Sequence, residues 1–160
     1  MVEAAPRLAA HPGGLAITHQ TGERDVELVR RAYRDAGLAA RVEPFLDAMA
    51  REMKEADVIV SRAGSTSIAE LTAVGRAAIL VPLPTATDDH QTRNAEVLAR
   101  AGAAELLAQR DMTGAALADR ILALARDPAR RAALAAAARR LARPDAARVI
   151  VDRALQLVAR

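Results

Sequence analysis

Residues 61–70, with the sequence SRAGSTSIAE, have the composition of a turn that binds phosphate. A run of strand-type residues leads into the turn, and Gly64 permits a ligand to approach the backbone closely. The amides that open the following helix point outward at the positive end of its dipole, which favours a bound phosphate. Three hydroxyl side chains at residues 65–67 add donors, and Glu70, one turn later, can accept from the hydroxyls of a ribose.

The same segment also fits a simpler structural role. Ser67 and Glu70 match the S-x-x-E capping box, in which two side chains only satisfy the free groups at the start of a helix. Such a cap stabilises a helix by about 1 kcal/mol and needs no ligand. The residues by themselves favour the phosphate site and the capping box equally, so both interpretations stay open.

A second polar segment, residues 82–94, follows an apolar run of strand type and leads into a predicted helix. His90 and Asn94 lie on one face of that helix, and Gln91 lies close to the same face. These neutral side chains suit the hydroxyl groups of a sugar. The two aspartates at residues 88–89 suggest a metal site, but no further ligand cluster accompanies them, so we expect them to cap the helix.

Two further segments follow predicted strands. Residues 43–49 form an apolar loop whose backbone N–H and C=O groups can hold a flat base, with Leu46 and Met49 against its faces. Packing in the core is the more common role of such side chains. His19, at the end of the first predicted strand, fits a ligand-facing group and a structural histidine equally well. The sequence offers no set of nucleophile, base and orienting residue, so we do not expect a self-contained hydrolase.

The composition predicts one globular domain with a core of Ala, Leu, Val and Ile. The chain has 160 residues, of which 52% are hydrophobic, and Tyr33 and Phe45 are its only Phe, Tyr or Trp residues. Its 23 basic and 20 acidic residues are interspersed and leave a formal charge of +3, so we expect no nucleic-acid partner. The lack of cysteine excludes disulfides and thiolate metal sites. No apolar run reaches the roughly 18 to 20 residues of a membrane span.

Apolar runs of strand length alternate with segments of helical period, which predicts an α/β fold with a parallel sheet flanked by helices. The predicted strands are residues 15–19, 40–43, 58–61, 78–81 and 104–107. The predicted helices are residues 3–10, 24–36, 48–55, 66–74, 90–101, 113–125, 128–141 and 145–158. We expect a single domain over residues 1–160, with the helices of residues 113–160 packed on it.

The start of the chain departs from the usual order of a doubly wound sheet, which opens with a central strand and a glycine-rich turn. Here a predicted helix comes first, and the pair Gly13 and Gly14 precedes its strand instead of following it. We therefore expect the first strand of the sheet to be missing. Its absence leaves unpaired backbone groups on both neighbouring strands.

Six motifs, taken in order, resemble the C-terminal, donor-binding domain of the MurG family of GT-B glycosyltransferases. They are residues 19–22 (HQTG), 44–49 (PFLDAM), 61–64 (SRAG), 69–71 (AEL), 79–82 (ILVP) and 89–95 (DHQTRNA). The resemblance covers nearly the whole chain and implies a Rossmann-like domain. It further implies transfer of N-acetylglucosamine from its UDP donor to the lipid-linked muramoyl-pentapeptide of peptidoglycan synthesis, without a metal or other cofactor. Ala48 departs from the family pattern, which has a second Asp at this point.

The resemblance also assigns residues to the donor, UDP-N-acetylglucosamine. The backbone near Leu46 would hold uracil, with Met49 beside it. The residues assigned to the diphosphate and ribose are Ser65, Thr66, Ser67, Ile68, Ala69 and Glu70. Gln91, with His90 and Asn94, would bind the sugar hydroxyls. The resemblance identifies no catalytic residue in this chain.

Peripheral contact with the cytoplasmic face of the cell membrane, and a part in cell-wall biogenesis, cell shape and cell division, are also implied. The family's acceptor-binding N-terminal domain has no counterpart in these 160 residues, so we expect weak donor binding and no transfer by this chain alone. Two alternatives stay open. One is a non-catalytic donor-binding subunit that docks on a membrane-anchored acceptor subunit, as in split N-acetylglucosaminyltransferases. The other is a relative of the UDP-sugar epimerases, which share the fold.

Overall fold

The computed structural model of the chain describes residues 1–158. The strands are β1 (Ile17–Gln20), β2 (Ala40–Glu43), β3 (Val58–Ser61), β4 (Ala77–Leu80) and β5 (Glu105–Leu106). The α-helices are α1 (Ala5–Ala9), α2 (Val26–Asp35), α3 (Met49–Glu55), α4 (Ser65–Val74), α5 (His90–Arg100), α6 (Gly114–Arg126), α7 (Pro128–Leu141) and α8 (Ala146–Val158). The short 3-10 helices are η1 (Val2–Ala4), η2 (Thr87–Asp89) and η3 (Gln109–Asp111). Each predicted strand and helix is present, with slightly different bounds.

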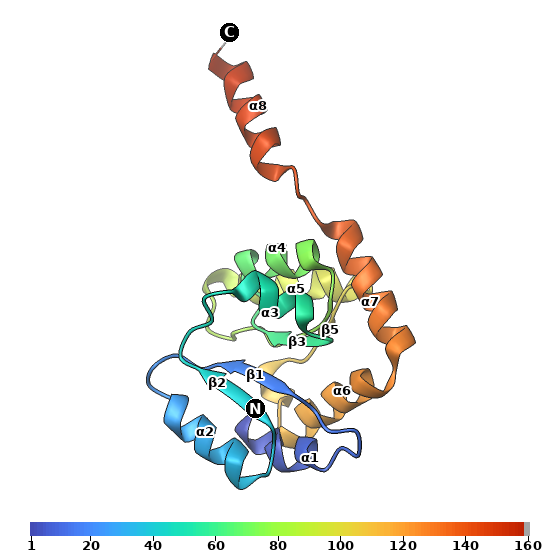
Figure 1. The fold of residues 1–160 in the computed structure, drawn as a ribbon. Helices are drawn as coiled ribbons and strands as arrows, with labels where there is room; N and C mark the ends of the chain where they lie inside the picture. Colours follow the sequence, from blue (N-terminus) through green and yellow to red (C-terminus); the bar gives the residue numbers. More distant parts are fainter. Residues whose placement is uncertain (159–160) are drawn as a thin grey trace.

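The strands form two parallel sheets instead of one (Figure 1). β1 pairs with β2, while β4 lies between β3 and β5 in the second sheet. Within residues 1–158 no ladder joins β1 to β3. The sheet is therefore interrupted between β1 and β3, as expected from the missing first strand. This is the position at which the strand order of a Rossmann-like sheet places its first strand.

Strand β4 separates two hydrophobic cores, and all four of its residues are buried. Ala77 and Ile79 belong to one core, while Ala78 and Leu80 belong to the other, because successive side chains of a strand point to opposite faces. Helices α1, α2 and α6 cover the first core, α3, α4 and α5 cover the second, and α7 contributes to both. Burial on both faces is typical of an inner strand of an α/β fold.

The N-terminal segment packs inside the first core. Ala4, Ala5 and Leu8 have no exposed surface, and α1 lies against α6. Gly114, the first residue of α6, lies so close to this segment that an added Cβ would stand 2.6 Å from the carbonyl carbon of Glu3. The predicted opening helix is thus confirmed, although its first turn is a 3-10 helix.

Helix α8 corrects the prediction that all the helices after residue 113 pack on the domain. Helices α6 and α7 do so, but none of the described residues of α8 is buried. Ile150, Leu155 and Leu157 are each more than 60% exposed. Figure 1 shows α8 standing away from the rest of the fold. Pro144 breaks the helix before α8, and the apolar face that follows has no partner within residues 1–158.

Candidate functional site

Helix α4 begins directly after the turn that follows β3, and it lacks a side-chain cap. Gly64 is the N-cap residue, and the helix starts at Ser65. Ser67 is therefore the third residue of the helix, so it cannot form the capping box with Glu70. The capping-box interpretation is wrong because the helix starts three residues earlier than that motif requires. The first amides of α4 consequently have no side-chain cap.

The residues at the start of α4 differ in their exposure to solvent. Those at the surface are Ser65, Thr66, Ala69 and Glu70. Ser67 is half-buried, and Ile68 packs against the second core. The exposed hydroxyls and the carboxylate lie on the first turns of the helix, next to its uncapped amides.

Gly64 leaves open space at the start of α4. Its backbone, at φ −65° and ψ 152°, is one that any amino acid adopts, and an added Cβ would meet nothing within 4 Å. Neither backbone strain nor packing within the described residues therefore requires glycine here. The free space lies at the positive end of the helix dipole, where an anion is stabilised.

Gln91 and Asn94 fasten the turn after β3 to the start of α5. The Oε1 atom of Gln91 accepts from the backbone N–H of Ala63 at 3.3 Å and from that of Leu83 at 3.0 Å. The Nδ2 group of Asn94 donates to the carbonyl of Ala63 at 2.9 Å. The two side chains predicted to bind a sugar therefore also set the shape of the turns after β3 and β4.

Arg62 also bonds to the turn after β4, and it was not singled out from the sequence. Its Nη1 group donates to the carbonyls of Val81 at 3.1 Å and Pro82 at 3.3 Å, and to Oε1 of Gln109 at 2.7 Å. These partners are 19 to 47 positions away along the chain. No local pattern in the sequence points to such distant bonds.

The polar residues before α5 differ from the expectation. Asp88 and Asp89 both have a left-handed backbone with φ 51°, and Asp89, the N-cap residue, makes no side-chain cap bond. The prediction that these aspartates cap the helix is therefore wrong. The exposed His90 donates from Nδ1 to the carbonyl of Thr87 at 2.7 Å, which closes the turn. Within residues 1–158 no group of three His, Asp or Glu side chains is placed to hold a metal ion.

The predicted base loop begins where β1 and β2 end. The backbone N–H of Thr21 donates to the carbonyl of Glu43 and that of Gly22 to the carbonyl of Pro44, both at 3.0 Å. The N–H of Leu46 donates to the side-chain Oε1 of Gln20 at 2.9 Å. Residues 20–22 of the HQTG motif thus contact the first half of the loop, at Glu43, Pro44 and Leu46.

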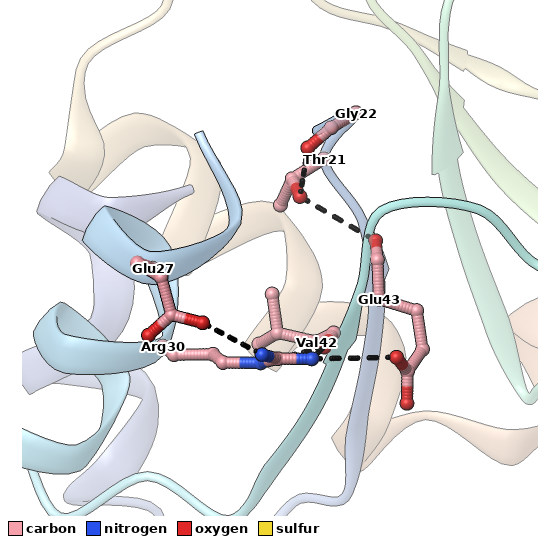
Figure 2. Close-up of polar contacts among 6 residues, drawn as sticks. All are labelled: Thr21, Gly22, Glu27, Arg30, Val42 and Glu43. Atoms are coloured by element: carbon pink, nitrogen blue, oxygen red, sulfur yellow. Dashed lines mark hydrogen bonds and ion pairs between the residues drawn. The ribbon is translucent and has the colours of Figure 1, made fainter. Parts of the chain in front are cut away.

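Figure 2 shows how Thr21 and Arg30 contact the end of β2. The hydroxyl of Thr21 donates to the carbonyls of Gly22 and Glu43. Arg30, on α2, donates from Nε and Nη2 to the carbonyl of Val42 at 3.0 and 2.8 Å, and it also pairs with Glu43. Because β2 is an edge strand in the described structure, this guanidinium both satisfies a backbone carbonyl of the strand and fixes the residue before the base loop.

The side chains of the base loop point in different directions. Leu46 is only 8% exposed, which contradicts the prediction that its side chain lies against a base. Met49 packs against the second core, beside α4. Phe45 is 67% exposed and was not selected from the sequence. The sequence could have pointed to Phe45, because it is the single phenylalanine of the chain and lies in an apolar loop after a strand.

His19 has a structural role. Its Nδ1 lies 2.8 Å from the hydroxyl of Tyr33, a residue of α2 that is 1% exposed. Burial lowers the pKa of His19 below its ordinary value, and the charge of the N-terminal amine lowers it further. Burial raises the pKa of Tyr33 to about 12. Of the two interpretations of His19, the structure supports the strand-end histidine.

The candidate site is an open surface along the carboxyl ends of the strands. A hollow of about 530 Å³, lined by residues such as Arg34, Gly37 and Ala40, lies at the amino end of β2 instead. We therefore assign this hollow no part in the site, because ligands of open parallel sheets bind beyond the carboxyl ends of the strands.

Comparison with known families identifies the domain. The family described as the glycosyltransferase family 28 C-terminal domain matches residues 1–150. This chain belongs to that family. The family 28 domain therefore extends through the two sheets and α7 and into α8.

Similar curated proteins carry the name UDP-N-acetylglucosamine--N-acetylmuramyl-(pentapeptide) pyrophosphoryl-undecaprenol N-acetylglucosamine transferase. The one from Geobacter sulfurreducens is 49% identical over 152 residues, which is 95% of this chain and 42% of that protein. The one from Anaeromyxobacter sp. is 46% identical over 160 residues, which is 100% of this chain and 42% of that protein. The family 28 domain thus spans less than half the length of these relatives.

Solved structures give the same classification. The crystal structure of Acinetobacter baumannii MurG superposes with a TM-score of 0.85 at 39% identity, over 92% of this chain and 43% of that one. The spinosyn forosaminyltransferase SpnP matches with a TM-score of 0.60 at 21% identity, over 96% of this chain and 46% of that one, which shows a shared fold alone. The predicted fold class, a Rossmann-like half of a GT-B glycosyltransferase, is confirmed.

Proposed function

We propose that this chain binds UDP-N-acetylglucosamine as the donor-binding half of an N-acetylglucosaminyltransferase. The observation that carries the proposal is the uncapped start of α4, with open space beside Gly64, next to the turns that Gln91 and Asn94 of α5 hold in place. The names of the similar proteins support this choice of donor.

The diphosphate is proposed to lie against the first amides of α4. Free amides, a helix dipole and exposed hydroxyls at Ser65 and Thr66 stabilise negative charge at that point. Glu70 lies one turn further on and is exposed, so its carboxylate can accept hydrogen bonds from both ribose hydroxyls.

The sugar is proposed to lie between α4 and the start of α5. The two backbone amides occupy Oε1 of Gln91, which leaves its Nε2 as the donor toward a sugar hydroxyl. Asn94 in turn uses Nδ2 within the protein and retains Oδ1 as an acceptor. His90 remains at the surface and completes the proposed polar rim.

Uracil is proposed to lie at residues 43–49, against the backbone of Leu46 and near Met49. The exposed ring of Phe45 offers a face for stacking, and such base–aromatic contacts contribute about 1–3 kcal/mol. The buried side chain of Leu46 anchors the loop instead of touching the base.

The acceptor is proposed to be the lipid-linked muramoyl-pentapeptide of peptidoglycan synthesis, bound by a further domain or partner chain. Peripheral contact with the cytoplasmic membrane face, and a part in cell shape and division, belong to the same proposal. Among residues 1–158 no helix is long and apolar enough to cross a membrane.

Titration of the purified chain with UDP and UDP-N-acetylglucosamine, followed by calorimetry or NMR, tests the proposal. We expect binding of both ligands and no transfer to a lipid-linked acceptor. Glu70→Ala should weaken UDP binding by about 1–3 kcal/mol, the scale of lost hydrogen bonds to a charged group. Gly64→Ala should weaken it by a similar amount, since a methyl group forced into a filled space costs about 1–3 kcal/mol.

Gly64→Ala also provides its own control. Because the added methyl group meets nothing in the empty protein, the free energy of unfolding should stay nearly unchanged. No detectable binding of either ligand, or equal affinity in both variants and the original chain, would overturn the proposed function. Transfer by the purified chain would show that the acceptor site is also contained in it.

A further inference from the structure

Gln20 is a polar residue at the site to which neither the family resemblance nor the proposed function assigns a ligand contact. It is the last residue of β1 and pairs in register with Glu43, the last residue of β2. Its exposed side chain crosses to the base loop, where Oε1 accepts from the N–H of Leu46 at 2.9 Å. In the proposed function this same N–H faces uracil.

A side-chain amide and the imide edge of uracil present the same hydrogen-bonding groups. Each places a carbonyl acceptor beside an N–H donor in one plane. The backbone of Leu46 offers the complementary pair, one N–H donor and one C=O acceptor. Gln20 thus meets Leu46 with the type of group that a uracil base would bring.

We infer that Gln20 is a stand-in for the base, and that its carbonyl must leave the N–H of Leu46 before the C4 carbonyl of uracil can bind there. This inference rests on the proposed function. Gln20 therefore lowers the affinity for uridine nucleotides, and it keeps the amide of a buried residue satisfied while the site is empty.

The contacts around the loop show why Gln20 is not needed to position it. Two backbone hydrogen bonds, from Thr21 to Glu43 and from Gly22 to Pro44, already hold the two segments together at 3.0 Å. Arg30 fixes the end of β2 independently through the carbonyl of Val42. Removing the side chain of Gln20 therefore leaves the loop in place and frees only the N–H of Leu46.

The test compares the original chain with Gln20→Met, which keeps the length of the side chain but lacks a strong acceptor. NMR titration with UDP should show that Gln20→Met binds about 2- to 10-fold more tightly, the equivalent of one neutral hydrogen bond no longer broken on binding. In the original chain the side-chain amide resonances of Gln20 should shift together with the backbone amide of Leu46 as UDP is added. Gln20→Ala should give a similar gain.

CDP serves as the control ligand, because cytosine carries an amino donor where uracil has the C4 carbonyl, and this amino group cannot accept from the N–H of Leu46. Its affinity should be the same in Gln20→Met and the original chain. Unchanged or weaker UDP binding in both variants would overturn the inference while leaving the proposed function intact. An equal gain for CDP would also overturn it, since the effect would then be independent of the base. No UDP binding by any of the three chains would overturn the proposed function and this inference with it.

Discussion

Gln91 has two separable roles, and two substitutions distinguish them. Gln91→Ala removes the oxygen that accepts from the backbone amides of Ala63 and Leu83, together with the nitrogen proposed to bind the sugar. Gln91→Glu keeps an oxygen in the same place but replaces the nitrogen by a second acceptor. We therefore expect alanine to lower both stability and donor binding, and glutamate to lower donor binding alone.

The expected loss of stability follows from the two bonds. A neutral hydrogen bond contributes about 0.5–1.5 kcal/mol, so Gln91→Ala should lower the free energy of unfolding by about 1–3 kcal/mol. The bond to Ala63 is the longer one, at 3.3 Å, but Ala63 has no exposed surface, and its unpaired N–H would be costly. A carboxylate at Gln91 accepts from both amides and lies in the first turn of α5, where the helix dipole favours negative charge.

Urea denaturation followed by circular dichroism measures this difference. With a slope of about 1–3 kcal/mol per molar urea, the midpoint of Gln91→Ala should fall by on the order of 1 M, and that of Gln91→Glu should hardly move. Calorimetric titration should show weaker UDP-N-acetylglucosamine binding in both variants. An unchanged midpoint in Gln91→Ala would refute the bonds to the two turns, and equal loss of stability in both variants would refute the role of the shared oxygen.

Three further predictions concern the fold. Gly75 ends α4 with φ 64°, and an added Cβ would overlap the side chain of Arg139 on α7. Gly75→Ala should therefore lower the free energy of unfolding by about 1–2 kcal/mol or more. Equal urea midpoints for Gly75→Ala and Gly64→Ala would contradict this prediction. Below pH 6.5, unfolded His19 binds a proton that the folded form, with its lowered pKa, does not bind, so stability should fall as the pH drops from 6.5 toward the folded pKa. His19→Gln should flatten that part of the pH profile, and an unchanged slope would exclude His19 as its source. Ending the chain at Ala142 removes α8, in which none of the described residues is buried. Thermal and urea unfolding should therefore be unaffected. A decrease of more than about 1 kcal/mol in the free energy of unfolding would show that α8 packs on the domain.

The sequence by itself determined the order of the elements and the class of fold. The strand at residues 58–61 appears at the predicted position because a short apolar run bounded by turn residues is a local signal. Pro128 and Pro144 likewise marked the start of α7 and the break before α8. The ordered motifs led to the family for the same reason, since each motif is short and continuous in the chain.

Only the tertiary structure decided which groups of those motifs are available to a ligand. Gln91 and Asn94 were correctly placed on the first turns of α5, but their bonds to Ala63 span 28 and 31 positions of the chain. Whether Ser67 and Glu70 form a capping box depended on whether α4 starts at Ser65 or later, and tertiary packing contributes most of the stability of a helix in a protein. The bond between Gln20 and Leu46 joins two strand ends that meet only because β1 and β2 pair in parallel. Local periodicity carries no information about such long-range contacts, whereas folding brings them within hydrogen-bonding distance.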